Sequence, residues 1–239
     1  MSSVTTEFLQ KNVAETEKVF NDLTKTFKNY VQKQEKVREQ LFKLIKVLKN
    51  CSTQVPSSSK KYIEALSNAL TLIEYYTKIT DDRINQRICK NLDFFSSDNC
   101  KVVKDIIQES KEATKNDIKS QSSLNKAVIK DPTNSKKIAN LQYDLNHRIN
   151  SSNKTNENIT NTIEIFNRSK LKILRNTMDE FLYGEIIYHA KALESLTFAH
   201  ETLNNSNINK DVKEILFNLK RDLIKKSEFT PNMSDFHIK

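Results

Sequence analysis

The chain has 239 residues, and its 39 Lys and Arg exceed its 30 Asp and Glu to give a formal net charge of +9. One Gly, three Pro and no Trp are typical of long helices and coiled coils, because so few breakers permit few turns. The same scarcity of Gly excludes phosphate-cradling loops and dinucleotide fingerprints. Cys51, Cys89 and Cys100 show no paired spacing, which indicates reduced thiols rather than a disulfide framework.

The first predicted helix covers about residues 5–50 and carries a heptad repeat. Its positions fall in two registers, one at Leu9, Thr16, Leu23, Tyr30, Val37 and Leu44 and the other at Val13, Phe20, Phe27, Gln34, Leu41 and Leu48. Thr16 and Gln34 are mild interruptions of a pattern that otherwise fits the a and d positions of a coiled coil. We therefore expect this helix to lie along a partner helix for most of its length.

The second predicted helix covers about residues 59–130 and follows a Ser- and Pro-rich break at 51–59. Its apolar spacing runs through Ile63, Leu66, Leu70, Ile73, Ile84, Ile88, Leu92 and Phe95. The polar cluster at 96–99 then weakens this pattern, which indicates either a bend within one helix or a break into two.

A tight turn at 130–134 separates the second helix from a third one at about 134–205. Pro132 cannot continue a helix, because it lacks an amide donor and disfavours the helical region for the residue before it. Asn134 or Ser135 can cap the helix that follows. The third helix repeats Ile138, Leu145, Ser152, Ile159, Phe166 and Ile173 in one register, so a helical hairpin is expected.

The segment 178–203 of the third helix is apolar on more than one face, and a helix of that kind must be buried nearly all round. This breadth predicts a surface where two protomers meet. Gly184 in its middle costs about 1 kcal/mol relative to Ala, which indicates a close backbone approach or a kink. The residues expected at the dimer interface are Phe181, Gly184, Ile187, Tyr188, His189, Leu193 and Leu196.

A short fourth helix is expected at about 209–225, followed by a flexible tail at 227–239. Its apolar stripe is narrow and its polar face carries both signs of charge, so it can pack against the bundle or lie on a membrane. Packing is the preferred interpretation. The whole of 1–226 is expected to form one helical domain.

Most of the net positive charge lies on the hairpin, where residues 101–175 hold fifteen Lys and Arg against eight Asp and Glu. Lysines of the second helix share an arc of roughly 100°, while Val102, Ile106, Ala113, Leu124 and Ala127 lie opposite and are expected to face the core. The alternative is an ordinary solvated lysine face. The candidate lipid-binding residues are Lys104, Lys111, Lys115, Lys119, Lys126, Lys130, Lys136, Lys137, Arg148 and Lys154.

Other classes of function are disfavoured by the residues that the chain lacks. The four His residues show no paired spacing with one another or with Cys, so no metal site, cofactor or catalytic residue is predicted, and neither an enzyme nor a small-molecule substrate is expected. Nucleic-acid modules interleave aromatic or Arg contacts with their basic groups, whereas here the stripe is almost all Lys. No signal peptide or membrane-spanning run is found, which predicts a cytoplasmic protein.

The segment 180–194, EFLYGEIIYHAKALE, resembles the third-helix signature of the Chibby-interacting BAR-domain family, and Phe8-Leu9-Gln10 with Glu17-Lys18-Val19-Phe20 is similar to its first helix. The similarity extends over about residues 7–205. Gly184 and Ala190 depart from the family pattern. The resemblance implies a cytosolic dimer that binds and remodels membranes and works with a Chibby-like coiled-coil partner at the centriole and ciliary basal body; a mitochondrial membrane is a second address that this N-terminus does not support.

The predicted fold is all-α, with three long, kinked, antiparallel helices that form an elongated coiled-coil homodimer of BAR type. Two hypotheses for function follow. In the first, the dimer senses or generates curvature and engages anionic lipids, phosphatidylserine or phosphoinositides, through its lysine-rich face and tips. In the second, the chain is a spectrin-like scaffold that contacts only proteins. Binding to anionic vesicles distinguishes the two.

Overall fold

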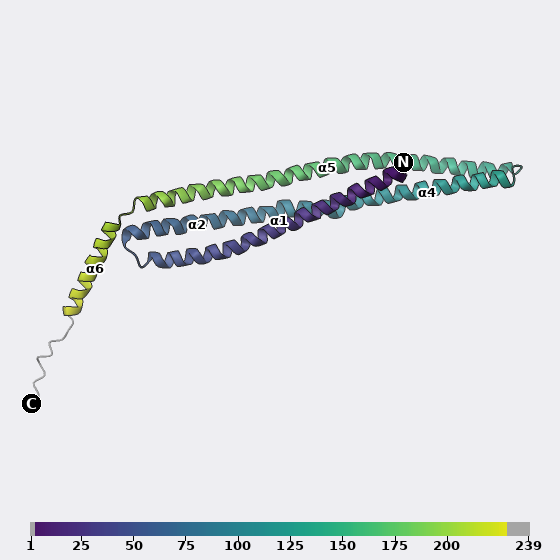
Figure 1. Ribbon diagram of the computed structural model, residues 1–239. Helices are drawn as coiled ribbons and strands as arrows, with labels where there is room; N and C mark the ends of the chain where they lie inside the picture. Colours follow the sequence, from purple (N-terminus) through teal and green to yellow (C-terminus); the bar gives the residue numbers. More distant parts are fainter. Residues whose placement is uncertain (1–2, 229–239) are drawn as a thin grey trace, which may run out of the picture. The chain divides into compact units, whose positions relative to one another are not determined.

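The computed structural model describes residues 3–228, and that part of the chain is helical apart from its turns (Figure 1). The helices are α1 (Ser3–Ser52), α2 (Ser57–Arg83), α3 (Lys90–Phe94), α4 (Cys100–Lys130), α5 (Ser135–Asn204) and α6 (Ile208–Glu228), with π-helical segments η1 (Ile84–Cys89) and η2 (Phe95–Asn99) between α2, α3 and α4. The all-α fold is therefore confirmed, but the predicted count of three helices is not, since α6 is a further helix of the described residues.

The turns lie where Pro and capping residues interrupt the helical pattern. Pro56 directly precedes α2, and Pro132 lies in the turn between α4 and α5. The Asn134 side chain accepts a hydrogen bond from the backbone N–H of Lys137 at 3.2 Å, which is the contact of an N-cap. Asn134 is thus the cap of α5.

The polar cluster at 96–99 does not break the second helical segment. Asn99 keeps helical dihedrals of −65° and −42°, and the chain passes through η2 directly into α4. Ile84, Ile88 and Leu92 are all buried and recur every four residues. An α-helix would turn this spacing away from the core by about 40° at each step, whereas the wider π-turns hold more residues per turn and keep these side chains inward.

Contacts divide the chain into two compact units. The first comprises the residues up to Val31 and Arg83–Leu182, and it has an extended apolar core. Its buried members are Val13, Phe20, Val31, Ile84, Ile88, Cys89, Leu92, Phe95, Cys100, Val103, Ile107 and Phe166. The Phe95 ring lies 4.4 Å from that of Phe20 and 5.2 Å from that of Phe166, so one aromatic stack joins α1, η2 and α5.

Within the first unit, α1 runs antiparallel to the second helical segment. Lys28 donates to Asp93 at 2.8 Å, and nearer the start of α1 the Glu17 carboxylate pairs with Lys104. Burial raises the pKa of the Cys89 thiol in this core. It also raises the pKa of the Cys100 thiol, to about 11, so both side chains are neutral and structural.

The second unit comprises Gln32–Asp82 and the residues from Tyr183 on, and among its described residues Ala65, Ala69 and Ala199 form a buried apolar cluster, with Ile45 and Ile63 also buried. Many of its large apolar side chains face solvent in the single chain. They include Val37, Phe42, Leu44, Val47, Leu72, Tyr75, Ile79, Tyr183, Ile186, Leu193, Leu196, Phe198 and Leu203. Val37 and Leu44 continue the heptad register of α1, yet no helix of the described chain covers them.

Two carboxylates in the first two turns of α6 hold this helix against the start of α2. Asp211 accepts from the backbone N–H groups of Ser58 and Ser59 at 3.1 and 2.9 Å, and Glu214 accepts from the Ser57 hydroxyl at 2.7 Å. These groups satisfy helix-terminal N–H donors and complement the positive end of the α2 dipole. The helix continues to Glu228, and the rest of the tail predicted for 227–239 lies outside the described residues.

The buried face of α4 differs from the expected one. Leu124 is buried as predicted, but the assignment of Val102 to the core was wrong, since its side chain is 54% exposed while Val103 and Ile107 are buried. The reason is that α4 packs against α1 as well as α5, which turns its core face towards the lysine side.

Candidate functional site

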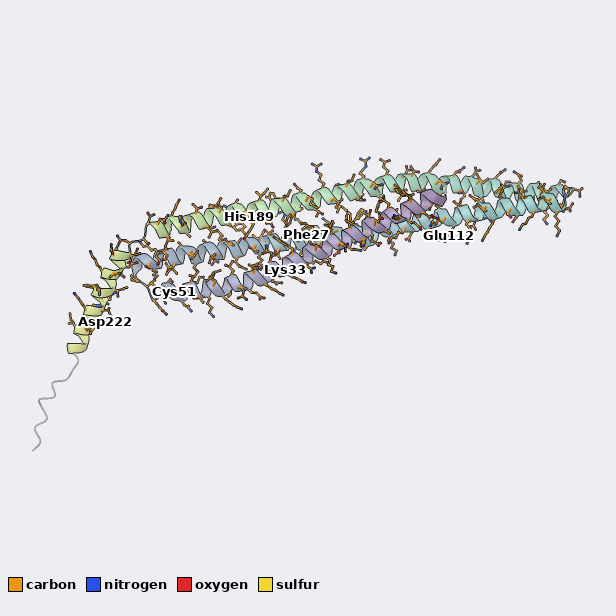
Figure 2. All side chains as sticks on the ribbon, viewed as in Figure 1. Phe27, Lys33, Cys51, Glu112, His189 and Asp222 are labelled. Carbon is orange, nitrogen blue, oxygen red and sulfur yellow. The ribbon has the colours of Figure 1, made fainter. Side chains whose placement is uncertain are left out.

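Four lysines of α4 lie on the exposed side of the helical hairpin. Lys115, Lys119, Lys126 and Lys130 are all exposed, and they follow Glu112, which Figure 2 labels on α4. Their spacing of four, seven and four residues places them on one side of the helix. Glu112 lies one heptad before Lys119 on the same side and offsets part of this charge, whereas Asp117 lies off the line, so the four lysines leave a net positive charge there.

Lys104 and Lys111 belong to the same stripe but contact α1. Lys104 forms an ion pair with Glu17, and the Lys111 ammonium donates to the amide oxygen of Gln10. Both lysines are partly buried. They hold α1 on α4, so their charge is less available to an external anion than that of the other four.

The remaining candidate cations follow the turn on α5. Lys136, Lys137, Arg148 and Lys154 are exposed. In the turn itself, a hydrogen bond from the Thr133 hydroxyl lowers the pKa of the Asp131 carboxyl, with a smaller contribution from Lys137. Asp131 is therefore ionised and offsets part of the positive charge at the tip.

The residues predicted at a dimer interface differ in how far they are exposed. Phe181 packs edge-on against Phe27 at 5.6 Å within the first unit. In the second unit Gly184 is buried, Ile187 and Tyr188 are half-buried, and Leu193 is 70% exposed. Leu196 is also exposed, and His189, labelled in Figure 2, has an exposed ring 3.4 Å from Glu185.

Exposed apolar residues of α1 and α2 extend this candidate surface beyond what the sequence identified. Phe42, Val47 and Leu72 were not predicted as interface residues. The continuing heptad register of α1 through Val37 and Leu44 was the signal that could have found this part of the surface.

Glu180, the first residue of the motif at 180–194, has a defined structural role. Its carboxylate pairs with Arg83 at the end of α2 and, at 3.3 Å, with Arg87 in η1. Two Arg partners for one half-buried carboxylate fix α5 against the first π-turn. The spacing of these residues in the sequence does not predict this pairing.

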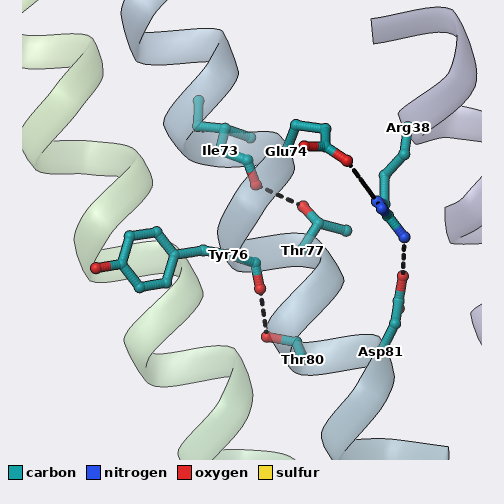
Figure 3. Close-up of polar contacts among 7 residues, drawn as sticks. All are labelled: Arg38, Ile73, Glu74, Tyr76, Thr77, Thr80 and Asp81. Carbon is teal, nitrogen blue, oxygen red and sulfur yellow. Dashed lines mark hydrogen bonds and ion pairs between the residues drawn. The ribbon is translucent and has the colours of Figure 1, made fainter. Parts of the chain in front are cut away.

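A charged cluster joins α1 and α2 in the second unit (Figure 3). Arg38 donates to Glu74 at 2.8 Å and lies 3.5 Å from the buried carboxylate of Asp81. Burial raises the pKa of Asp81 to about 6, although the nearby Arg38 opposes this shift. Thr77 and Thr80 beside it donate to backbone carbonyls and leave the Asp81 charge to Arg38.

Neither a metal centre nor a membrane span is found between residues 3 and 228. No group of three or more His, Cys, Asp or Glu side chains is placed to hold a metal ion in that range. None of the helices there combines the length and apolar character that crossing a bilayer requires.

A protein-family model described as FAM92 protein matches residues 2–214. The chain belongs to the FAM92 family. The match includes α1 to α5 and the first residues of α6, up to residue 214, so the resemblance seen at 180–194 extends over most of the fold described above. Membership of this family confirms the kinship expected from the sequence motif.

Relatives of this FAM92 member carry BAR domains. The chain is 23% identical to CBY1-interacting BAR domain-containing protein 1 of Mus musculus, over 87% of this chain and 72% of that protein. It is 22% identical to the protein of the same name from Danio rerio, over 84% and 68% of the two chains.

Solved structures place the chain in the BAR fold. The N-terminal I-BAR domain of D. discoideum IBARa matches 92% of this chain and all of that chain, with a TM-score of 0.59 and 14% identity. The F-BAR domain of Hof1p matches 95% and 94% of the two chains with a TM-score of 0.57 and 8% identity. At these identities the likeness concerns the fold alone, and the BAR-type architecture is established for the FAM92 chain.

Proposed function

We propose that the protein is a membrane-binding BAR-type homodimer that senses or generates curvature, and that it engages anionic lipids through the exposed cations of the α4–α5 hairpin. The observation that carries this proposal is the concentration of eight exposed Lys and Arg side chains on the hairpin of a BAR fold. They are Lys115, Lys119, Lys126, Lys130, Lys136, Lys137, Arg148 and Lys154.

Diffuse electrostatic attraction suits this set of residues. Each Lys or Arg near an anionic leaflet contributes about 1 kcal/mol, and the contribution disappears within a Debye length of the surface. Lys is a compact, strongly hydrated charge, so it favours a negatively charged surface over one defined planar ligand. A phosphatidylserine- or phosphoinositide-rich membrane offers many such charges at once.

The second unit supports a homodimer. Among its described residues three alanines form the buried apolar cluster, while Leu193, Leu196 and Phe198 on α5 and Val37 and Phe42 on α1 are exposed. Clusters of exposed, large apolar side chains mark interaction sites. A second copy offers the same surface, so the apolar faces of the two protomers would cover each other, as in isologous dimers.

The relatives' name supports a cellular role for this dimer. It describes those proteins as interacting with CBY1. We extend this to a Chibby-like coiled-coil partner, a cytoplasmic location at membranes, and a role in ciliogenesis at the centriole and basal body. The domain proposed to carry this activity is 1–226.

Vesicle sedimentation tests the lipid-binding step. Lys115, Lys119, Lys126 and Lys130 are changed together to Gln, and a matched variant changes Lys25, Lys33, Lys36 and Lys43, four exposed lysines of α1. At about 1 kcal/mol per charge, the hairpin variant should lose more than about a hundredfold in affinity for phosphatidylserine vesicles at low salt. The α1 variant should lose much less, and both should keep wild-type thermal stability.

Two outcomes would contradict the proposal. If the wild-type chain failed to sediment with strongly anionic vesicles, the chain would be a protein-binding scaffold. If the two variants lost affinity equally, net charge rather than the hairpin surface would govern binding. Negative-stain imaging of tubulated vesicles with Lys136 and Lys137 changed to Gln tests whether the tip is needed for curvature.

A further inference from the structure

The α4–α5 hairpin contains an apolar groove of about 520 Å³. Leu145 of α5 is buried in it, while Ile118 and Ile129 of α4 are 66% and 82% exposed. Its lining residues are Asp117, Ile118, Gln121, Ser122, Asn125, Lys126, Ile129, Leu145 and Ile149. Isoleucines this exposed beside a buried Leu indicate a surface that a further apolar element would cover.

The groove continues the seat in which α1 lies. Gln10 meets Lys111 and Glu17 meets Lys104, so steps of seven residues on α1 match steps of seven on antiparallel α4. The first turns of α1 border a second hollow of about 470 Å³, whose lining includes Ile118. Ile118 therefore belongs to both hollows. Figure 1 shows the hairpin extending beyond the start of α1 to the turn at 131–134.

The charge beside the groove restricts what can occupy it. Ile118 and Ile129 point in nearly the same direction on a helical projection of α4. All four exposed lysines lie to one side of that direction and within about 110° of it; they are Lys115, Lys119, Lys126 and Lys130. The helices of this chain do not complement these lysines. Over its described length α1 holds ten Lys and Arg against six Asp and Glu, and α6 holds six against four.

We infer that the groove binds an amphipathic helix of a second protein, antiparallel to α4, with apolar residues against Ile118, Ile129 and Ile149 and with Asp or Glu residues towards the lysines. The contact repeats the mode of α1, which presents Gln10 to Lys111 and Glu17 to Lys104, one and two heptads before Ile118 on α4. A lipid surface would meet the lysines equally well, but it would not fill a groove that a buried Leu145 lines. This surface is distinct from the apolar face of the second unit.

A designed peptide of three heptads tests the inference on the full-length chain. It carries Leu at positions a and d and Glu at e and g, and a charge-reversed peptide carries Lys in place of Glu. Fluorescence anisotropy should detect the acidic peptide and show binding of the basic peptide that is at least tenfold weaker. Ile129→Ser should lower the affinity for the acidic peptide about tenfold. Lys126→Gln should reduce the difference in affinity between the acidic and the basic peptide.

The matched control is Ile165→Ser, because Ile165 is a 65% exposed isoleucine of the same unit outside the groove. It should leave peptide binding unchanged. Equal binding of the two peptides, or equal loss in Ile165→Ser and Ile129→Ser, would overturn the inference. So would an Ile129→Ser variant that binds peptide normally but loses affinity for phosphatidylserine vesicles, since the groove would then face lipid. Loss of self-association in Ile129→Ser by light scattering would assign the groove to a second copy instead.

Discussion

The two compact units share helices α1 and α5, yet they bury these helices to very different extents. In the first unit the aromatic rings of Phe20, Phe95 and Phe166 stack in a closed core. In the second, the same helices leave Val37 and Leu193 exposed over a cluster of three alanines. A single chain can therefore bury the apolar face of a helix along part of its length and leave the rest of that face for a partner to cover.

The largest expected effect is on the closed core. Phe95→Ala removes a fully buried ring with two aromatic neighbours, so it should lower the free energy of unfolding by about 3–5 kcal/mol. Phe94→Ala is the matched control, because the neighbouring ring is 61% exposed and its loss should cost within about 0.5 kcal/mol. Urea unfolding followed by circular dichroism measures both. Equal losses would mean that the core is not closed in solution.

The second test concerns the open unit and compares two exposed leucines of α5. Leu193→Glu should weaken self-association by about thirtyfold or more, since a central interface residue contributes about 2 kcal/mol or more. Leu171→Glu, at a 65% exposed position in the first unit, should leave association unchanged. Sedimentation velocity across a dilution series measures this, and a wild-type chain that stays monomeric at micromolar concentration would contradict a dimer through this face.

A smaller effect is expected where α6 meets α2. Asp211→Ala removes the acceptor for two backbone N–H groups and one hydroxyl at the start of α2, which should cost about 1 kcal/mol. Asp222→Ala, further along α6 and exposed, serves as the control. Hydrogen exchange at Ser58 and Ser59 should accelerate only in the first variant; unchanged exchange there would show that α6 does not cap α2.

A pH dependence is expected in the second unit, where Arg38 offsets only part of the cost of burying Asp81. The pKa of Asp81 rises from 3.8 to about 6 on folding, so the folded chain holds the proton more tightly. The proton on Asp81 therefore stabilises the folded chain at low pH, and this stabilisation is lost as the pH rises from 3.8 to about 6. Relative to Asp81→Asn, the wild type should lose unfolding free energy over this window, whereas Asp222→Asn, at an exposed position of α6, should run parallel to the wild type. Parallel curves for Asp81→Asn would contradict the shift.

Much of this fold could be predicted because its signals are local. Pro132 and Asn134 mark the hairpin turn by backbone chemistry alone, and the register of Leu145, Ile159 and Phe166 identifies buried positions of α5 that the structure confirms. The interpretation of 96–99 stayed open because a π-turn is set by i→i+5 bonding and by neighbouring packing, which composition does not encode.

Side chains that depend on two neighbours at once were harder to predict. A helical projection of α4 shows which residues share a side, but α1 decides that Val103 is buried and Val102 is not. For the same reason Lys104 and Lys111 were grouped with Lys115 and the rest of the stripe, although they contact α1. The lipid-binding and dimer residues stay predictions, because they concern contacts with molecules outside this chain.

The π-helical segments η1 and η2 also have a consequence for the history of the sequence. A π-turn holds one residue more than the α-helical path around the same axis, so it accommodates a single-residue insertion without a loop. In this chain the buried Ile84, Ile88 and Leu92 stay inward because of that extra residue. When aligned with this chain, relatives with a purely α-helical segment at the same place should therefore show a one-residue gap within Ile84–Cys89 or Phe95–Asn99. The turn before Ser135 should still align with the turn of their hairpin.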